Sequence, residues 1–245
     1  MIKKLLSMTE QELYRHIRNT IPCIAAPDYL VTDFHRIPVP MICVHLDTVS
    51  LYPPKLFKCE HGIITAPGSV CLGADDRAGV WIALEMIKQG TLTPFEYGFF
   101  MGEEIGGIGS GAYADTKPNH TCYIGLDRAS KGGKQNLATY GYDSQELIDC
   151  FPYPESYGTM SDCSVLADAT NTPCVNLSVG YDFEHTPKEQ LNIAQMIETL
   201  NVMLNINIPE IEYSKAICCD MCGEHLPLYD KNGLILCRGC LYYDY

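Results

Sequence analysis

The sequence predicts an α/β fold, with a mixed and mostly parallel sheet flanked by helices, followed by a small C-terminal zinc ribbon. Two observations indicate the sheet. Apolar runs typical of buried strands alternate with helical segments, and polar residues follow several of those runs directly. Two Cys-x-x-Cys pairs near the end of the chain indicate the ribbon. With 245 residues there is room for one large domain and one appendage, which we place at residues 1–212 and 213–245.

The composition is that of a soluble globular protein, with 47% hydrophobic and 19% charged residues. A net charge of −13 argues against a sequence-independent nucleic-acid binder and against attraction to anionic membranes. No apolar run reaches the length of a membrane span, and the first residues lack the apolar core of a signal peptide. The 13 cysteines are an odd number in a long chain. Nine of them are dispersed along the chain, many within apolar segments, as free thiols in a reducing compartment would be, so we expect a cytoplasmic protein.

Three segments carry helix signals. Residues 9–12 read TEQE, a capping box that opens a short helix. A second helix follows Asp76 and ends at Gly90, because glycine readily adopts the left-handed conformation beyond a helix C-terminus. Pro187 suits the first turn of a last helix. Its core-facing stripe would be Leu191, Ile193, Ile197, Leu200 and Leu204.

Four apolar runs predict buried strands, at residues 38–44, 95–101, 121–126 and 173–179. Each run is followed by side chains that can bind metal or transfer protons: His45, Glu103, Glu104, Asp127 and His185. In open α/β sheets the carboxyl ends of the strands form the edge where ligands bind. The sequence therefore gathers these side chains at one rim of the sheet.

The stretch LGADDRAG at residues 72–79 places two adjacent carboxylates in a turn rich in glycine and alanine. Taken alone, such a pair is typical of a helix N-cap, and that interpretation holds for Asp76. Small residues on both sides also let the backbone come close to whatever Asp75 holds. We therefore expect a tight backbone at Asp75 rather than an ordinary turn.

The rim would collect two imidazoles and four carboxylates: His45, His185, Asp75, Asp127, Glu103 and Glu104. In a dry cleft, like charges would force some of these acids to protonate unless cations were present. A pair of divalent metal ions resolves this, because one carboxylate can bridge both ions while each takes a histidine and a further acid. Mixed nitrogen and oxygen ligands suit Zn²⁺, with Mn²⁺ or Co²⁺ as alternatives.

One adjacent acid is then left for proton transfer. A carboxylate beside a metal-bound water can take its proton and later give it to a leaving amine. In Glu103-Glu104 the neighbouring side chains point in different directions, so one can bind metal while the other acts as the base. Asp47 lies two residues beyond His45 and can hold the far ring nitrogen of that histidine.

Several separated motifs resemble those of a known superfamily. They are HLDTV at residues 45–49, GADDRAG at 73–79, GEEIGG at 102–107, Asp127, GTMSD at 158–162 and HTPKE at 185–189. In this order they resemble the motifs of the co-catalytic dizinc exopeptidases, which include peptidase T, the carboxypeptidase G group and the bacterial leucyl and tetrahedral aminopeptidases. The resemblance covers residues 40–205, and the last motif is most similar to the aminopeptidase branches.

The resemblance implies that five residues bind the two metals: His45, Asp75, Glu104, Asp127 and His185. Asp75 would bridge the ions, with His45 and Asp127 on one of them and the other two ligands on the second. The motifs define the ligand set, whereas this partition is inferred. Glu103 would be the general base, and Asp47 would be the partner of His45.

The chain departs from many of its relatives in lacking a lid. Those relatives carry a lid or dimerisation domain, inserted between the first histidine and the bridging aspartate or before the final histidine. The segment from His45 to Asp75 is too short for such an insert, and the segment from Asp127 to His185 is also short. The sequence therefore predicts a minimal catalytic domain, in which the family pattern does not define the substrate specificity.

The C-terminal appendage contains two Cys-x-x-Cys pairs: Cys219 with Cys222, and Cys237 with Cys240. Four thiolates in this spacing predict one structural Zn²⁺, and Asn232-Gly233 between the pairs suits a hairpin turn. Redox-active cysteine pairs are the alternative interpretation, and the adjacent Cys218 could compete as a ligand. A closed site with four cysteines is not catalytic. Acidic residues outnumber basic ones here, which disfavours nucleic acid as a partner.

We therefore expect a metal-dependent amidohydrolase, an aminopeptidase or dipeptidase acting on a peptide or small amide. One alternative is a deacylase of a non-peptide amide. Another is an acyltransferase similar to glutaminyl cyclase, with one zinc ion on the same scaffold. A third is a catalytically silent binding module in which the ribbon carries the function. The aromatic tail at residues 241–245 could pack on the catalytic domain or on a neighbouring subunit, and the second case would make the protein a homo-oligomer.

Overall fold

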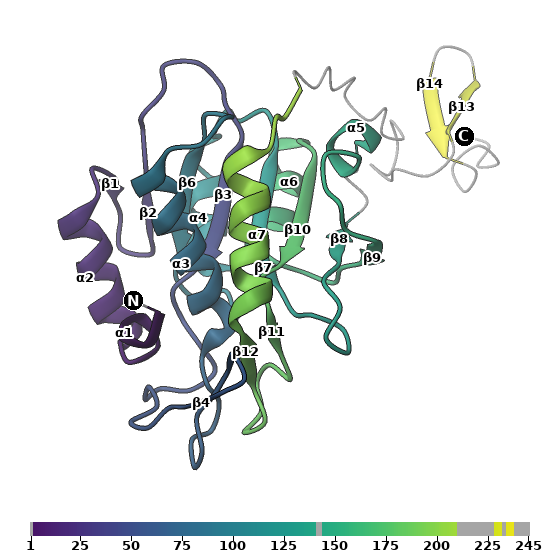
Figure 1. Cartoon of the computed structure of the whole chain (residues 1–245). Helices are drawn as coiled ribbons and strands as arrows, with labels where there is room; N and C mark the ends of the chain where they lie inside the picture. Colours follow the sequence, from purple (N-terminus) through teal and green to yellow (C-terminus); the bar gives the residue numbers. More distant parts are fainter. Residues whose placement is uncertain (1, 141–143, 210–227, 232–233, 238–245) are drawn as a thin grey trace. The chain divides into compact units, whose positions relative to one another are not determined.

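The larger part of the chain is an α/β domain built on one eight-stranded sheet (Figure 1). The computed structural model describes residues 2–140, 144–209, 228–231 and 234–237. The chain divides into two units, Met1–Ile211 and Glu212–Tyr245. The alternation of apolar runs and helices thus predicts the fold class of the first unit correctly.

The large sheet has the strand order β1-β2-β6-β3-β7-β10-β8-β9. These strands are β1 (Ile24–Ala25), β2 (Tyr29–Val31), β6 (Glu96–Phe100), β3 (Met41–His45), β7 (Tyr123–Arg128), β10 (Cys174–Ser178), β8 (Leu137–Thr139) and β9 (Glu155–Tyr157). The central strands β6, β3, β7 and β10 pair in parallel, whereas β1, β2 and β6 are joined by antiparallel pairs, as are β10 and β8. Every residue of β3, β6 and β10 is buried, which explains why these strands appear as continuous apolar runs.

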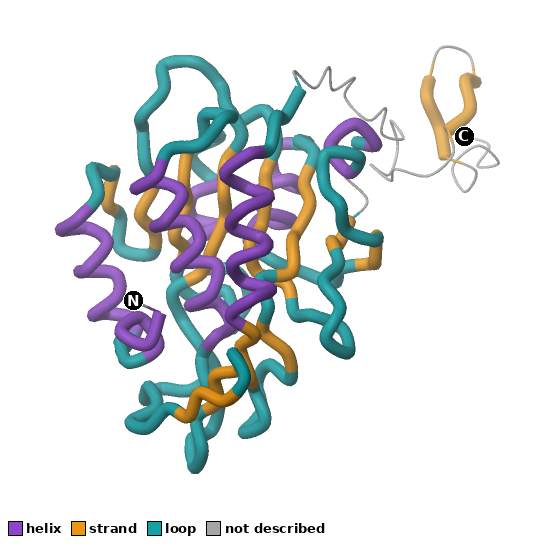
Figure 2. Tube along the Cα trace, viewed as in Figure 1, coloured by secondary structure: helices purple, strands orange, loops and turns teal. Residues whose placement is uncertain are grey.

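Helices cover both faces of this sheet (Figures 1 and 2). On one face α3 (Ala74–Gln89) packs against α7 (Ile193–Asn205), and on the other α4 (Ile108–Ala114) packs against α6 (Asp162–Thr170). The remaining helices of this unit are α1 (Ile2–Leu6), α2 (Glu10–Thr20) and α5 (Gln145–Ile148). Among the described residues, no helix combines the length and the apolar character that crossing a membrane requires.

A second, smaller sheet connects distant parts of the chain. It is antiparallel and has the order β11-β12-β5-β4, with β11 (Tyr181–Asp182), β12 (Gln190–Asn192), β5 (Ile63–Thr65) and β4 (Lys58–Glu60). Pairing of β5 with β12 brings the segment before α3 next to the loop that carries His185. This small sheet therefore assembles one side of the rim.

Two of the predicted helix boundaries are confirmed. Thr9 and Glu12 form the capping box of α2: Glu12 N donates to Thr9 Oγ1 at 3.3 Å, and Thr9 N donates to the Glu12 carboxylate at 2.9 Å. The helix α3 ends at Gly90, whose φ of +79° is a backbone angle that favours glycine.

The helix predicted to begin at Pro187 is wrong. Residues Gln190–Asn192 form β12, and α7 begins only at Ile193. Residues 190–192 pair with β5 instead, and the Asn192 side chain caps α7 by accepting hydrogen bonds from Ala194 N and Gln195 N. The predicted stripe is also incomplete, because Leu191 is buried in a strand and Ile197, which lies within α7, is 42% exposed.

Gly79 lets α3 lie directly against β7. A Cβ atom at this position would stand 1.9 Å from the carbonyl oxygen of Leu126 and 2.5 Å from Asp76 Oδ1. The backbone before it is not that of a regular helix start: Asp75 has φ −78° and ψ 103°, and the Asp75–Asp76 peptide bond is cis. The backbone at Asp75 therefore departs from that of a regular helix start, and only glycine fits where Gly79 contacts β7.

The described part of the second unit is one antiparallel hairpin, formed by β13 (Leu228–Lys231) and β14 (Leu234–Cys237). Its strands flank Asn232-Gly233, where the sequence predicts a hairpin turn. Cys237 is the last residue of β14. The other predicted zinc ligands, Cys219, Cys222 and Cys240, lie outside the described residues.

Replacing Gly79 with alanine should lower the free energy of unfolding by about 3 kcal/mol, because helix and strand must move apart to admit the methyl group. Gly111 in α4 is the matched control, since a Cβ there meets no atom within 4 Å. Gly111→Ala should change stability by no more than about 1 kcal/mol, in the stabilising direction. Urea denaturation of both variants measures the difference, and equal stabilities would contradict the close packing at Gly79.

Candidate metal centre

One edge of the large sheet brings five candidate ligands together. They are His45 at the end of β3, Asp75 at the start of α3, Glu104 after β6, Asp127 in β7 and His185 between β11 and β12. The sequence places Asp127 just beyond its strand, whereas the residue lies within β7. The general base candidate Glu103 and the candidate partner Asp47 lie at the same edge.

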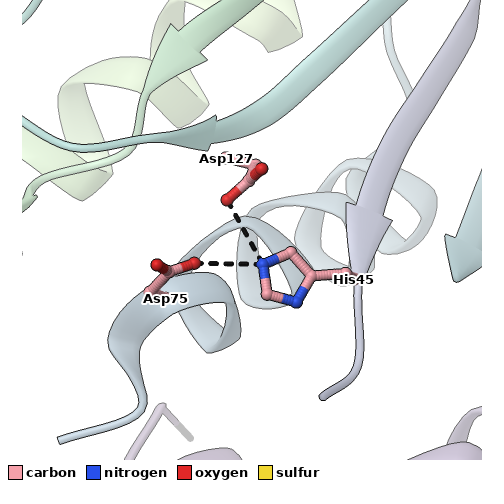
Figure 3. A group of neighbouring side chains, drawn as sticks. All are labelled: His45, Asp75 and Asp127. Atoms are coloured by element: carbon pink, nitrogen blue, oxygen red, sulfur yellow. Dashed lines mark hydrogen bonds and ion pairs between the residues drawn. The ribbon is translucent and has the colours of Figure 1, made fainter. Parts of the chain in front are cut away.

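The candidate ligands form two groups that share Asp75. The first is His45, Asp75 and Asp127 (Figure 3), and the second is Asp75, Glu104 and His185. Within each group the candidate ligand atoms all lie within 4.8 Å of one another. This grouping has the same membership as the partition inferred from the sequence.

The two oxygens of Asp75 face different histidines. Asp75 Oδ1 lies 3.0 Å from His45 Nε2, and Asp75 Oδ2 lies 3.1 Å from His185 Nε2. The same ring nitrogens approach the outer acids: His45 Nε2 is 3.4 Å from Asp127 Oδ1, and His185 Nε2 is 2.9 Å from Glu104 Oε2. Asp75 is therefore placed to contact two ions at once.

The donor set fits divalent cations. Each group offers one imidazole nitrogen and carboxylate oxygens, the mixture that suits Zn²⁺, Mn²⁺ or Co²⁺. His45 is 1% exposed, and Glu104 Oε1 is buried without a hydrogen-bond partner among the described residues. A buried carboxylate oxygen without a partner is costly unless a cation or a donor satisfies it.

The acids of the site crowd one another. Burial, followed by repulsion from Asp75, raises the pKa of Glu104 to about 7. Burial, followed by repulsion from Asp127, raises the pKa of Glu103 to about 9. The hydrogen bond to Asp75 raises the pKa of His185 to about 9. A divalent cation at each group would lower all three values, because added positive charge favours carboxylates and neutral imidazole.

The Asp47 carboxylate contacts three parts of the site: the ring of His45 and the backbone N–H groups of Glu103 and Glu104. Its Oδ1 lies 3.3 Å from His45 Nδ1, on the side of the ring away from Asp75. The same carboxylate accepts hydrogen bonds from Glu103 N at 3.1 Å and Glu104 N at 3.0 Å. Contacts of this kind orient a ligating histidine and fix which ring nitrogen points at the metal. Asp47 therefore acts on His45 and on the paired glutamates together.

Glu103 lies at the wall of a cleft that adjoins both groups. The cleft has a volume of about 470 Å³, and Asp75, Glu104, Asp127 and His185 also line it. Glu103 is 9% exposed, and its carboxylate makes no hydrogen bond or ion pair with the described residues. Its two oxygens are thus free to contact a molecule in the cleft.

No protein-family model matches the sequence, and no curated protein matches it significantly. Solved structures do resemble it. Aminopeptidase PepT from Bacillus cereus has a TM-score of 0.61 at 15% identity, over 82% of this chain and 94% of that chain. The TET1 peptidase of Pyrococcus horikoshii has a TM-score of 0.62 at 13% identity, over 78% and 91%. A tripeptidase from Staphylococcus aureus has a TM-score of 0.60 at 14% identity, over 82% and 95%.

The chain has the fold of these peptidases. Because the identities are low, the likeness concerns the fold, and at that level it confirms the expectation drawn from the motifs. The two groups of candidate ligands therefore lie on a fold that is similar to those of two aminopeptidases and a tripeptidase.

Glu189 supports the candidate metal centre and was not predicted from the sequence. Its Oε2 accepts hydrogen bonds from Leu72 N at 2.8 Å and Gly73 N at 2.9 Å. Its Oε1 accepts from Ala74 N at 2.7 Å and Asp75 N at 3.0 Å. One buried carboxylate thus holds the whole turn that presents Asp75. The signal was present in the HTPKE motif, where Glu189 received no role.

Asp127 is held by two further residues that were also missed. Asn176 accepts from Asp127 N and donates to Asp127 O, both at 2.9 Å. Tyr181 donates from its hydroxyl to Asp127 Oδ1 at 3.1 Å. The available signal was an asparagine inside the apolar run at residues 173–179, because a polar residue in a buried strand needs a partner. Nothing in the sequence pattern singles out Tyr181.

Replacing Glu189 with glutamine should lower the free energy of unfolding by about 2–4 kcal/mol. The NH₂ group of the glutamine would take the place of one carboxylate oxygen, and it cannot accept the two backbone hydrogen bonds that this oxygen receives. Zinc affinity should fall as well, because the turn no longer presents Asp75. Glu155→Gln is the control, as Glu155 is exposed and its side chain makes no hydrogen bond within the described residues. Urea denaturation and zinc titration measure both effects, and wild-type behaviour of Glu189→Gln would contradict the role of this carboxylate.

Proposed function

We propose that the chain is a metal-dependent amidohydrolase, an aminopeptidase or dipeptidase that cleaves peptide bonds with water activated by two divalent ions. The observation that supports this most is the shared carboxylate of Asp75, whose oxygens face His45 and His185 at 3.0 and 3.1 Å. A carboxylate between two groups of mixed ligands suits a pair of ions that act on one substrate. The common fold with PepT and a tripeptidase is consistent with this activity.

In this proposal one ion binds His45 and Asp127, the other binds Glu104 and His185, and Asp75 contacts both. Bound Zn²⁺ would lower the pKa of water and polarise the carbonyl oxygen of the substrate. Mn²⁺ or Co²⁺ could occupy the same ligands.

Glu103 is the proposed general base. Its carboxylate faces the cleft without a protein partner, so it can take a proton from the attacking water. The same carboxyl group can then give that proton to the amine that leaves. Asp47 supports this step indirectly, because it holds the backbone N–H of Glu103 and lies against the ring of His45.

The alternatives differ in metal content and substrate. A cyclase-like acyltransferase would need only one zinc ion, so one of the two groups of candidate ligands would bind no metal. A deacylase would use the same two ions on a non-peptide amide. A silent binding module would leave Glu103 without a role. Activity against aminoacyl amides, dipeptides and N-acyl amino acids, with metal content measured on the same sample, separates these possibilities.

The second unit is proposed to bind one structural Zn²⁺ through Cys219, Cys222, Cys237 and Cys240. Four thiolates would close the coordination sphere, so the ion would stabilise the unit rather than take part in hydrolysis. The hairpin β13–β14 is compatible with a ribbon of this kind.

A homo-oligomer is a further proposal. The TET1 peptidase of Pyrococcus horikoshii can assemble into a tetrahedron or a large octahedral shell. The shared fold makes self-association a reasonable expectation for this chain, and light scattering of the purified protein measures its mass in solution.

Glu103→Gln should reduce turnover by about a hundredfold or more, because the amide cannot accept the proton of water. Metal content should stay unchanged, since Glu103 is not a proposed ligand. Glu184→Gln serves as the control, because Glu184 also lines the cleft but has no proposed role. Retained turnover in Glu103→Gln would exclude this residue as the base, whereas equal losses in both variants would point to a general effect of charge.

Metal content tests the assignment of ligands. The wild-type chain should contain two ions in the catalytic site and a third in the ribbon. His185→Ala should lose one ion and Asp75→Ala two, because Asp75 serves both groups. Cys237→Ser should lose only the ribbon ion and keep the other two. Elemental analysis of the purified variants gives these numbers, and a wild-type chain with a single ion outside the ribbon would favour the cyclase-like alternative.

A further inference from the structure

The cleft beside the ligand groups contains a positively charged side chain that the proposed reaction does not use. Arg128 follows Asp127 directly in β7 and lines the same cleft as Asp75, Glu103 and His185. The side chain is half-buried. The surroundings are otherwise dominated by carboxylates, so a guanidinium at this place needs an explanation.

Three neutral acceptors hold the guanidinium in place. Arg128 Nε donates to Asn136 Oδ1 at 3.1 Å, and Nη2 donates to Ser156 Oγ at 2.8 Å and to Tyr157 O at 3.2 Å. Asn136 is itself 6% exposed and donates to Ser178 Oγ at 3.1 Å. The orientation of the guanidinium is therefore set before any ligand arrives, which reduces the entropy lost on binding.

The charge of Arg128 has no counter-ion in the part of the chain that the structure describes. No carboxylate there forms an ion pair with it, and the two N–H donors of Nη1 have no acceptor among those residues. All three of its bonds go to uncharged oxygens. A fixed, partly desolvated guanidinium with unused donors is the arrangement that proteins use to bind carboxylate groups.

We propose that Arg128 binds a carboxylate of the substrate and makes the enzyme selective for peptides that carry one near the cleaved bond. This inference rests on the proposed peptidase function. The carboxylate can be the free carboxyl terminus of a short peptide or the side chain of an acidic residue, and both present the same planar pair of oxygens. Lys131 also lines the cleft, but it is exposed and adds only a diffuse positive charge.

The test measures binding separately from turnover. The full-length protein with Glu103→Gln is titrated calorimetrically with four peptides: leucyl-leucine, leucyl-leucine amide, glutamyl-leucine amide and leucyl-glutamic acid α-amide. At least one of the three peptides with a carboxylate should bind about tenfold or more tightly than leucyl-leucine amide. The peptide that gains affinity identifies the source of the carboxylate, namely the chain terminus or one of the two side chains.

Arg128→Gln, added to the same protein, should abolish this preference while leaving the affinity for leucyl-leucine amide within about twofold. Lys131→Gln is the matched control, because it removes the same charge from the cleft but should keep the preference. The unchanged affinity for the uncharged peptide separates recognition from a structural role of Arg128, since structural damage would weaken all four ligands.

Three results would overturn the inference: no preference for any carboxylate, no measurable binding of the carboxylate peptides, or a preference that survives Arg128→Gln. Turnover by the wild-type chain tests the underlying function independently. Equal cleavage of leucyl-leucine and its amide, with no preference among the acidic peptides, would support the peptidase and reject the role of Arg128. Selective binding without cleavage of any peptide would keep the carboxylate site and reject the peptidase.

Discussion

The position of the candidate metal centre depends on one carboxylate that binds four consecutive backbone N–H groups. The Glu189 carboxylate accepts hydrogen bonds from the backbone N–H groups of residues 72–75, which are buried and donate to no strand or helix carbonyl in the described part of the chain. Buried backbone donors without acceptors are costly, so this turn could not hold its shape without the glutamate. Because Asp75 belongs to both ligand groups, its placement sets the geometry of both.

Carboxylates elsewhere in the site have the same supporting role. Asp47 binds the backbone of the paired glutamates and contacts the ring of His45, while Asp76 accepts hydrogen bonds from His45 N and Gly79 N. Arg77 donates to Asp47 O and to Met8 O, and so connects the N-terminal helices to this edge. Carboxylates that line the cleft are thus held in place by other carboxylates, which accept hydrogen bonds from backbone N–H groups. Cations at the two groups would balance the negative charge that this arrangement concentrates.

The sequence predicts the rim well because its signals are local. An apolar run followed by His45 or Glu103 reveals both the strand and the edge at which it ends, and neighbouring residues suffice to see it. Glu189 was missed because its contacts join residues 114 to 117 positions apart, and no periodic pattern encodes such a pair. The helix predicted at Pro187 does not form for the opposite reason, since the pairing of β12 with β5 outweighs a local helix signal. Arg128 reads in the sequence as an ordinary residue at the end of a strand, and only its contacts distinguish it.

The long span bridged by Glu189 has a consequence for synthesis of the chain on the ribosome. A nascent chain that ends before residue 185 already contains His45, Asp75, Glu104 and Asp127, but it lacks both His185 and the carboxylate that shapes the Asp75 turn. Such a chain can fold its central parallel strands without being able to organise the second ligand group. Under the proposed ligand assignment, binding of both ions would therefore follow synthesis of residues 185–189.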